Sequence, residues 1–299
     1  MNSIHPAFIK HVYNKLGQEK GQQWLNLLPH RIDELVSRWN LTSIKPYDNL
    51  THNYVAHAYR GGKPVVLKIG PSVRAMNREA QALKYYAGNG CAALLDADLD
   101  SGALLLECVQ PGTSLKQLFP NDEKEAIKHA AIVMRQLHTK PLEPTHSFTT
   151  ITSWFDELAP QNNPALDAHI KRAQPLAKHL LATQKDLVLV HGDLHHENIL
   201  KNGSNSWIAI DPKGVAGEAA FEVGCFMRNP IDQLSDHPNI KQIVADRLDS
   251  FAQLLHIDRL RIQQWSYVQA VLAACWAYKN NKELAQQFLI VADALQSQE

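Results

Sequence analysis

The sequence predicts an α+β fold with two lobes, a β-rich N-terminal lobe and a larger, mainly helical C-terminal lobe. Short runs with β-strand character, separated by turns that contain Gly, lie between residues 43 and 109. Beyond the break at Pro111-Gly112, apolar residues recur mainly at helical spacing. A chain of 299 residues is near the size at which a single core stops growing, so two packed lobes are expected.

The N-terminal lobe is expected to start with a helical extension, residues 1–40, because apolar residues follow helical spacing over about 5–20 and 21–39. The lobe proper covers residues 41–109 and opens with a β-hairpin, in which Gly61-Gly62 separates two strand-like runs. The further elements expected in this lobe are a helix at 72–87 and strands at 93–98 and 102–109.

The C-terminal lobe, residues 110–299, is predicted to be mostly helical. Two short apolar runs, 187–190 and 207–210, are the exceptions, and each is interpreted as a strand. The segment between these two runs is rich in polar side chains, which makes it a candidate for the functional site. The helices expected in this lobe cover residues 122–138, 151–158, 164–183, 219–228, 238–255 and 258–297.

The composition argues against several classes of protein. The formal net charge is zero, so we expect no nucleic-acid partner held by phosphate neutralisation. No stretch approaches the roughly 18 apolar residues of a membrane span, so we expect a cytoplasmic protein with no membrane partner. The four Cys residues are far apart and lack the spacing of a metal site. A monomer and a homodimer remain equally open.

The segment between the two apolar runs has a spacing of polar residues typical of phosphoryl transfer. Asp193 follows the first strand, Asn198 comes five residues later, and Asp211 ends the next strand. The reaction needs a carboxylate to orient the attacking hydroxyl, which fits Asp193. It also needs oxygen ligands for Mg²⁺, which fit Asn198 and Asp211. This is the kinase arrangement, so we expect a small-molecule kinase that uses ATP and Mg²⁺.

Candidate nucleotide contacts lie in the N-terminal lobe. Lys68 stands in an apolar strand and needs a partner there, and Glu79, eleven residues later on the predicted helix, fits that need. In kinases such a pair directs the Lys at the nucleotide phosphates. The segment 104–112 fits a hinge that reads adenine through the carbonyl of Glu107 and the amide of Val109, or else an ordinary strand and turn.

Two segments carry a family resemblance that extends more weakly over about residues 40–280. HGDLHHENIL (191–200) and IDPKGVAGEAAFEVGCFMRNP (210–230) resemble the aminoglycoside phosphotransferase superfamily, in particular its aminoglycoside/hydroxyurea antibiotic resistance kinase branch. The resemblance implies a bilobal protein-kinase-like fold with Asp193 as the catalytic base. It also implies Mg²⁺ on Asn198 and Asp211, and phosphates on Lys68. No Gly-rich loop is evident between the first two strands, so the nucleotide contacts there stay open. The chain after Asp211 leaves little room for an activation loop, so a protein kinase is not expected.

The same resemblance gives roles to two further residues. His195 lies two positions after Asp193, where protein kinases place a Lys that contacts the transferred phosphoryl group, so a catalytic contact is expected. Glu222 is expected to brace the catalytic loop through backbone hydrogen bonds. His196 and Lys213 are interpreted as packing or solvated residues.

The acceptor is expected to be a small, cationic, hydroxylated molecule. Residues 1–140 carry 17 Lys and Arg against 12 Asp and Glu, whereas residues 141–299 carry 13 against 18, although chance surface charge explains this equally well. Carboxylates that follow the metal-binding strand are candidates to line the acceptor pocket. Aromatic residues are also candidates to form one wall of that pocket, unless they pack in the hydrophobic core. The candidate carboxylates are Glu218, Asp232 and Asp236, and the candidate aromatic residues are Trp265, Trp154, Trp276 and Tyr278.

Three functions stay open at this level. The resemblance favours a kinase that inactivates an aminoglycoside such as streptomycin. A kinase for another hydroxylated metabolite, such as a sugar, an amino alcohol or a hydroxyurea-like compound, would use the same scaffold. A non-catalytic nucleotide-binding protein is the third alternative, but all the expected catalytic residue types are present.

Overall fold

The computed structural model describes residues 6–296 and divides into two compact units. The N-terminal unit ends at Gly112 and the C-terminal unit begins at Thr113. This division lies three residues beyond the boundary expected from the sequence. Residue 5 of the expected first helix and residue 297 of the expected last helix lie outside the described residues.

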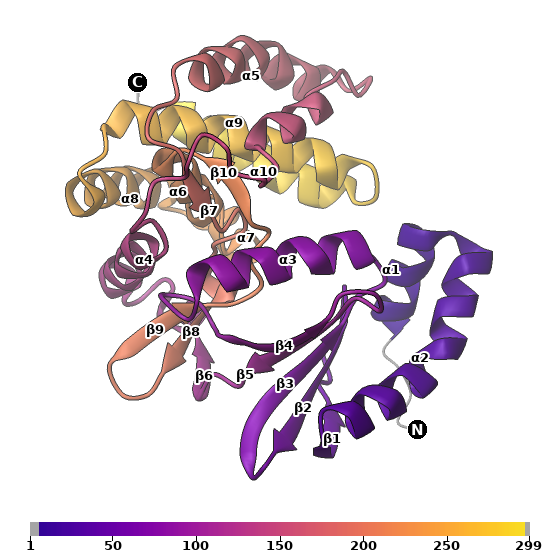
Figure 1. The fold of residues 1–299 in the computed structure, drawn as a ribbon. Coiled ribbons are helices and arrows are strands. Elements are labelled where there is room, and N and C mark those ends of the chain that lie inside the picture. The colour runs from indigo at the N-terminus through magenta and orange to yellow at the C-terminus, as the bar shows by residue number, and fades with distance from the viewer. Residues whose placement is uncertain (1–5, 297–299) are drawn as a thin grey trace. The chain divides into compact units, whose positions relative to one another are not determined.

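The N-terminal unit is built on a five-stranded antiparallel sheet with the order β1-β2-β3-β5-β4 (Figure 1). In the predicted hairpin Arg60 pairs with Lys63, so Gly61 and Gly62 alone form the turn. Both have positive φ, 57° and 77°, which a two-residue I′ turn requires and Gly adopts without steric cost. The strands are β1 (Leu41–Pro46), β2 (Tyr54–Arg60), β3 (Lys63–Ile69), β4 (Leu94–Asp98) and β5 (Ala103–Glu107).

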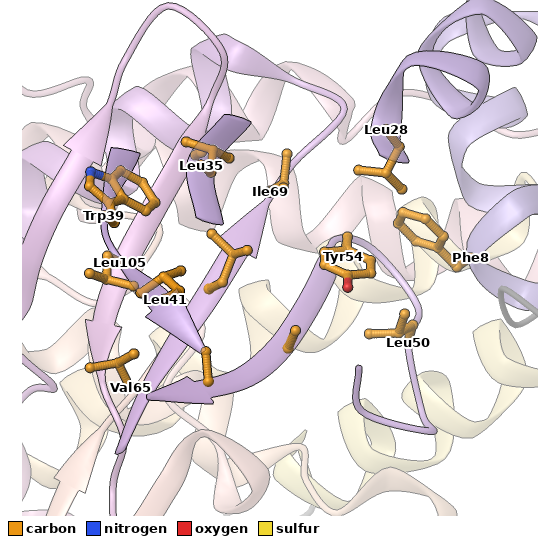
Figure 2. Close-up of a cluster of buried hydrophobic side chains, with 14 of the residues drawn as sticks. Phe8, Leu28, Leu35, Trp39, Leu41, Leu50, Tyr54, Val65, Ile69 and Leu105 are labelled. Carbon is orange, nitrogen blue, oxygen red and sulfur yellow. The ribbon is translucent and has the colours of Figure 1, made fainter. Parts of the chain in front are cut away.

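The described residues of this unit form the helices α1 (Pro6–Leu16), α2 (Gln18–Arg38) and α3 (Val73–Tyr86). Helices α1 and α2 share one buried apolar cluster with the sheet, and Figure 2 shows Phe8 and Leu28 beside Tyr54 of β2. Burial of one such side chain contributes about 1.5–3 kcal/mol. The segment expected as an extension is therefore part of the core of the N-terminal unit.

The C-terminal unit is mainly helical, as predicted. Helix α9 is buried along most of its length and packs against α5, α6 and α10. Its helices are α4 (Glu123–Leu137), α5 (Pro164–Ala182), α6 (Ala219–Met227), α7 (Ile231–Leu234), α8 (Ile240–Leu255), α9 (Arg259–Tyr278) and α10 (Lys282–Gln296). Short 3-10 turns are η1 (Leu115–Leu118), η2 (Ile151–Glu157) and η3 (His196–Asn198).

The helix expected over 258–297 is two helices in the described residues. Helix α9 ends at Tyr278, and α10 begins at Lys282 after Asn281, whose side chain accepts a hydrogen bond from the Leu284 amide at 3.0 Å. An Asn in this position satisfies an amide that a new helix leaves without a partner, so the helical pattern restarts here. Within residues 6–296 no helix is both long and apolar enough to span a membrane.

Short strands of the C-terminal unit position the polar segment. β7 (Val188–Val190) pairs antiparallel with β10 (Val215–Gly217), and β8 (Ile199–Asn202) pairs with β9 (Ser206–Ala209) in a three-stranded sheet of order β6-β8-β9. Strand β6 (Pro111–Ser114) runs across the division between the units. Strands β6, β8 and β10 were not predicted, because they are short and none of them has a run of four apolar residues like those at 187–190 and 207–210.

Candidate active site

The loop that follows β7 is held in place by a buried carboxylate from α6. Glu222 is 1% exposed and accepts hydrogen bonds from the amides of His191 at 2.5 Å and Gly192 at 3.0 Å. The predicted bracing role of Glu222 is therefore confirmed. The ring of His191 is buried, which lowers its pKa, and its Nε2 lies 2.7 Å from the Ile210 carbonyl oxygen. A neutral ring that donates to this carbonyl ties the loop to the strand leading to Asp211.

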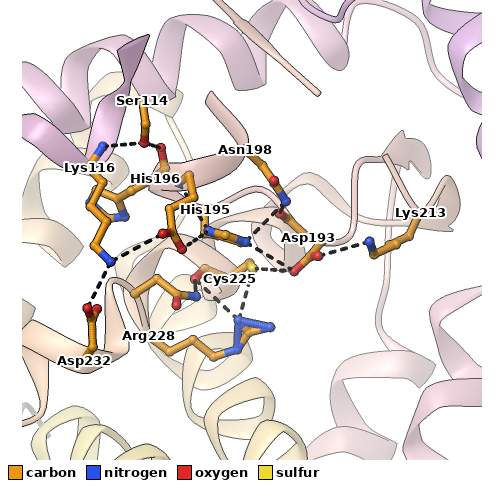
Figure 3. A network of polar contacts seen from close by, with 12 residues as sticks. Ser114, Lys116, Asp193, His195, His196, Asn198, Lys213, Cys225, Arg228 and Asp232 are labelled. Carbon is orange, nitrogen blue, oxygen red and sulfur yellow. Dashed lines mark hydrogen bonds and ion pairs between the residues drawn. The ribbon is translucent and has the colours of Figure 1, made fainter. Parts of the chain in front are cut away.

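Asp193 stands at the exposed end of this braced loop. Its side chain is 30% exposed, and its Oδ2 lies 3.2 Å from the Lys213 ammonium (Figure 3). The Cys225 thiol lies 3.6 Å from Oδ1. Burial opposes ionisation, but nearby positive charge, chiefly that of Lys213, outweighs it and lowers the pKa of Asp193 to about 2. The carboxylate is therefore ionised at neutral pH and can accept a hydrogen bond from a substrate hydroxyl.

The hairpin of β8 and β9 brings Asn198 and Asp211 together. Ile199 pairs with Ala209, and the Ile210 amide donates to the Asn198 carbonyl at 2.9 Å, so both side chains leave the same end of the hairpin. The Asn198 amide nitrogen donates to the Asp193 carbonyl oxygen at 2.9 Å, which ties this end to the catalytic loop.

The donor set at this end of the hairpin suits Mg²⁺. Because the Asn198 amide nitrogen donates to Asp193, its oxygen is the atom that can bind a metal. The described residues contain no cluster of three or more His, Cys, Asp or Glu that could hold a metal ion. Mg²⁺ usually takes only one or two carboxylates and completes its shell with phosphates and water. A side-chain amide and the carboxylate of Asp211 therefore fit this ion.

His195 is tied into the loop through Nδ1, which accepts from the Glu197 amide at 3.3 Å. A neutral ring that accepts on Nδ1 carries its proton on Nε2, which lies 4.0 Å from Asp193 Oδ1 (Figure 3). Burial is the main cause that lowers the pKa of His195. The ring is thus neutral in this arrangement, which differs from the cationic Lys at the matching position of protein kinases, and the expected contact of His195 with the phosphoryl group stays a prediction.

The buried ion pair expected in the N-terminal unit is present. Lys68 on β3 is 2% exposed, and its ammonium lies 2.8 and 2.9 Å from the two carboxylate oxygens of Glu79 on α3. The contact of Lys68 with nucleotide phosphates stays a prediction. At the end of β5 the Glu107 side chain accepts from the Ala93 amide at 3.0 Å, while the hinge contacts expected of the backbone of Glu107 and Val109 stay predictions too.

Two of the expected acceptor residues lie in the core instead. Trp265 has no exposed surface, and its indole N–H donates to Glu218, which also accepts from Arg261 at 2.7 Å. A side chain that is fully buried among its own partners cannot line an open pocket. The structure therefore corrects the expectation for Trp265 and Glu218, which anchor α9 to the start of α6.

The other two acidic candidates are exposed. Asp232 forms an ion pair with Lys116 at 3.0 Å, and Asp236 accepts a hydrogen bond from the Ser235 hydroxyl at 3.3 Å. Neither contact links them to Asp193. Their role toward an acceptor remains a prediction.

Two residues lie beside Asp193 although the sequence did not place them there. Lys213 was interpreted as a packing or solvated residue, and Trp154 was one of four candidate aromatic residues for the acceptor pocket. The Asp-Pro-Lys-Gly turn was the signal that could have revealed Lys213. Trp154 of η2 lies beside this loop, because a Cβ built on Gly192 would lie 2.9 Å from its ring. Trp154 also packs edge-on against the partly exposed Trp276, with 5.7 Å between ring centroids. Trp154 is 39 residues from Asp193 in the sequence, so spacing did not place it beside this loop.

Comparisons with known proteins agree with this geometry. Residues 38–281 match the family model described as aminoglycoside/hydroxyurea antibiotic resistance kinase. The chain is 25% identical to streptomycin 6-kinase of Streptomyces griseus over 98% of this chain and 97% of that protein. It is 26% identical to hydroxyurea phosphotransferase of Kitasatospora aureofaciens over 97% of this chain and 85% of that protein.

A solved structure shows the same fold at low identity. Choline kinase LicA from Streptococcus pneumoniae superposes with a TM-score of 0.64 at 15% identity, over 91% of this chain and 99% of that one. The fold is thus the two-lobed protein-kinase-like fold that was predicted. The family match, which covers most of the chain and includes the braced Asp193 loop, shows that this phosphotransferase belongs to the aminoglycoside/hydroxyurea antibiotic resistance kinase family.

Proposed function

We propose that this kinase transfers the γ-phosphate of ATP to a hydroxyl group of a cationic aminoglycoside of the streptomycin type. The observation that carries the proposal is the ionised Asp193, which stands on a loop braced by Glu222 and tied to Asn198. ATP as the phosphoryl donor is supported by the kinase family; Mg²⁺ and the acceptor are parts of the proposal.

Each residue has a defined task in this reaction. Asp193 accepts the hydrogen bond of the acceptor hydroxyl and takes its proton while the hydroxyl oxygen bonds to the γ-phosphorus. The bond from the γ-phosphorus to the bridging oxygen breaks, and its electron pair leaves with ADP. Asn198 and Asp211 would hold Mg²⁺, which when bound supplies positive charge to the phosphates. Lys68, aligned by Glu79, would contact the phosphates as well.

The nucleotide base would be read by backbone groups. The carbonyl of Glu107 and the amide of Val109 are proposed to hydrogen-bond adenine. The Glu107 side chain is already used by the Ala93 amide, which fixes the end of β5 and thereby orients the backbone that follows.

The surroundings of Asp193 support a cationic or ring-shaped acceptor. Trp154 lies against Gly192, directly before Asp193, and Trp276 extends this aromatic surface with 37% of its own area exposed. Indole faces attract ammonium and guanidinium groups. Streptomycin 6-kinase is similar along almost its whole length, which adds support.

A second candidate acceptor is a compound of the hydroxyurea type. It is favoured by hydroxyurea phosphotransferase, which at 26% identity is as similar to this chain as the streptomycin kinase is. An ATP-consumption assay over streptomycin, other aminoglycosides, hydroxyurea, sugars and amino alcohols separates the two, with mass spectrometry of the product. We expect a mass gain of one phosphoryl group on streptomycin. Turnover of hydroxyurea with no turnover of streptomycin would replace the first candidate by the second.

A further inference from the structure

The turn after β9 places a second Lys at the catalytic carboxylate. The Lys213 ammonium lies 3.2 Å from Asp193 Oδ2, and its side chain is 51% exposed (Figure 3). A half-exposed ion pair adds little to the stability of a fold, because water solvates both charges well without it. The fold therefore does not require Lys213 to stay at this position.

The backbone of Lys213 is fixed although its ammonium group is exposed. The Lys213 and Gly214 amides donate to the His191 carbonyl oxygen at 2.8 and 3.3 Å. Asp211 and Gly214 both have positive φ, 63° and 62°, so the turn has a specific and tight shape. The backbone of Lys213 is thus held by His191, two residues before Asp193, whereas its ammonium group lies at the end of four flexible carbons.

Two other basic residues near Asp193, His195 and Arg228, are less able than Lys213 to reach a phosphoryl group that is being transferred. His195 accepts the Glu197 amide on Nδ1, so its ring carries no second proton there. Arg228 is 7% exposed and donates to the carbonyl oxygen and the sulfur of Cys225 at 3.5 and 3.0 Å. Lys213 differs from both residues, because it is charged, its side chain is half-exposed, and its backbone is hydrogen-bonded to the catalytic loop.

We infer that Lys213 is a catalytic residue that contacts the phosphoryl group during transfer. Without substrates its ammonium pairs with Asp193. When the acceptor hydroxyl takes the Oδ2 position, the ammonium turns to the equatorial oxygens of the γ-phosphorus. The hydroxyl oxygen then bonds to phosphorus, ADP leaves with the bond's electron pair, and the hydroxyl proton goes to Asp193. The inference rests on the proposed function, because it concerns the same site and the same reaction.

The physical reason lies in where negative charge gathers. Phosphoryl transfer spreads charge over the three equatorial oxygens, and a donor aimed at those oxygens lowers the barrier more than it strengthens ground-state binding. Loss of one such donor in other enzymes lowers kcat by about 100-fold or more. A Lys that only balanced Asp193 in the free protein would not have this selective effect.

Steady-state kinetics of Lys213→Gln, Lys213→Arg and Lys171→Gln give the first test. Lys171 is an exposed residue of α5 and serves as the matched control. We expect Lys213→Gln to lower kcat by about 100-fold, and to change the KM for ATP and the KM for the acceptor by less than about threefold each. Lys213→Arg should recover part of the loss, and the control should behave as wild type. A Lys213→Gln variant with unchanged kcat would overturn the inference.

Titration calorimetry gives a readout that does not depend on turnover. It compares binding of MgADP alone with binding of MgADP plus tetrafluoroaluminate, a planar mimic of the transferred phosphoryl group. In Lys213→Gln, MgADP should bind within about twofold of wild type, while the gain in affinity from tetrafluoroaluminate should fall by about tenfold or more. An equal gain in both proteins would overturn the inference and leave the kinase function standing. No gain in wild type would instead count against the proposed function itself, and the inference would fall with it.

Discussion

Each of the two units has a Lys–carboxylate pair among its candidate catalytic residues, and these two pairs differ in burial. Lys68 and Glu79 in the N-terminal unit have side chains only 3% and 10% exposed, and both carboxylate oxygens contact the ammonium. Lys213 and Asp193 in the C-terminal unit are 51% and 30% exposed, and the ammonium lies 3.2 Å from Oδ2. One of these Lys–carboxylate pairs thus lies in the core of its unit, and the other lies at the surface of the catalytic loop.

The difference in burial assigns different tasks to the two pairs. A buried charge that loses its partner is strongly unfavourable, so Lys68 and Glu79 hold one another in a single geometry. An exposed pair can separate at little cost because water solvates both groups. We therefore expect Lys68 to be a fixed charge and Asp193 to be able to exchange Lys213 for a substrate hydroxyl.

Replacement of Asp193 by Asn should have the largest effect on activity. The amide keeps the shape but cannot take the hydroxyl proton, so we expect kcat to fall by about 1,000-fold. The measurement is the rate of ATP consumption with the acceptor identified in the screen. Asp186→Asn, an exposed loop residue, is the control and should leave the rate unchanged. Turnover of Asp193→Asn within tenfold of wild type would remove Asp193 from the catalytic role.

Replacement of Lys68 by Met should have the largest effect on stability. It leaves the Glu79 carboxylate buried without its ammonium partner, which costs about 3 kcal/mol of unfolding free energy. The matched change Lys213→Met at the exposed pair should cost less than about 1 kcal/mol. Urea denaturation followed by circular dichroism measures both. Equal losses would show that burial does not distinguish the two pairs.

Sequence reasoning succeeded where chemistry depends on local spacing. Asp193, Asn198 and Asp211 lie around one short hairpin, so their separation along the chain already places them together. Lys68 and Glu79 follow from one strand and the next helix. In these cases the intervening element has a predictable length, and the partner is found by counting residues.

Sequence reasoning failed where packing between distant elements decides. Trp265 was expected near the acceptor but lies in the core, because α9 is covered by other helices along most of its length. Trp154 reaches Gly192 only through the placement of η2. The break between α9 and α10 depends on Asn281, a residue that a long helical pattern easily hides. None of these contacts has a signature in spacing.

Replacement of Glu222 by Gln tests how rigidly the catalytic loop must be held. The amide group keeps one acceptor oxygen for the His191 and Gly192 amides but turns a donor toward the other, so one backbone amide loses its partner. We expect kcat to fall by about tenfold with nearly unchanged nucleotide affinity. Kinetics and MgADP calorimetry on the same preparation measure the two quantities. A variant that lost nucleotide affinity as well would indicate a wider role for Glu222.

The smallest expected effect is on acid stability and comes from His196. Its ring is fully buried and stacks on Phe226 with 3.8 Å between centroids, and burial, followed by the charge of Arg247, lowers its pKa well below 6.5. The unfolded chain therefore binds a proton that the folded protein does not. Stability contributed by the neutral ring is complete above pH 6.5 and is lost as the pH falls from 6.5 toward the folded pKa.

Comparison of His196→Leu with wild type isolates this contribution. Between pH 7 and pH 5.5 wild type should lose about 1 kcal/mol more unfolding free energy than the variant, because Leu has no proton to exclude. Urea denaturation at the two pH values provides the measurement, with the exposed His30→Leu as control. If the variant loses as much unfolding free energy as wild type between pH 7 and pH 5.5, His196 must also bind a proton in the folded protein. The loop beside Asp193 would then carry a positive charge that its buried surroundings disfavour.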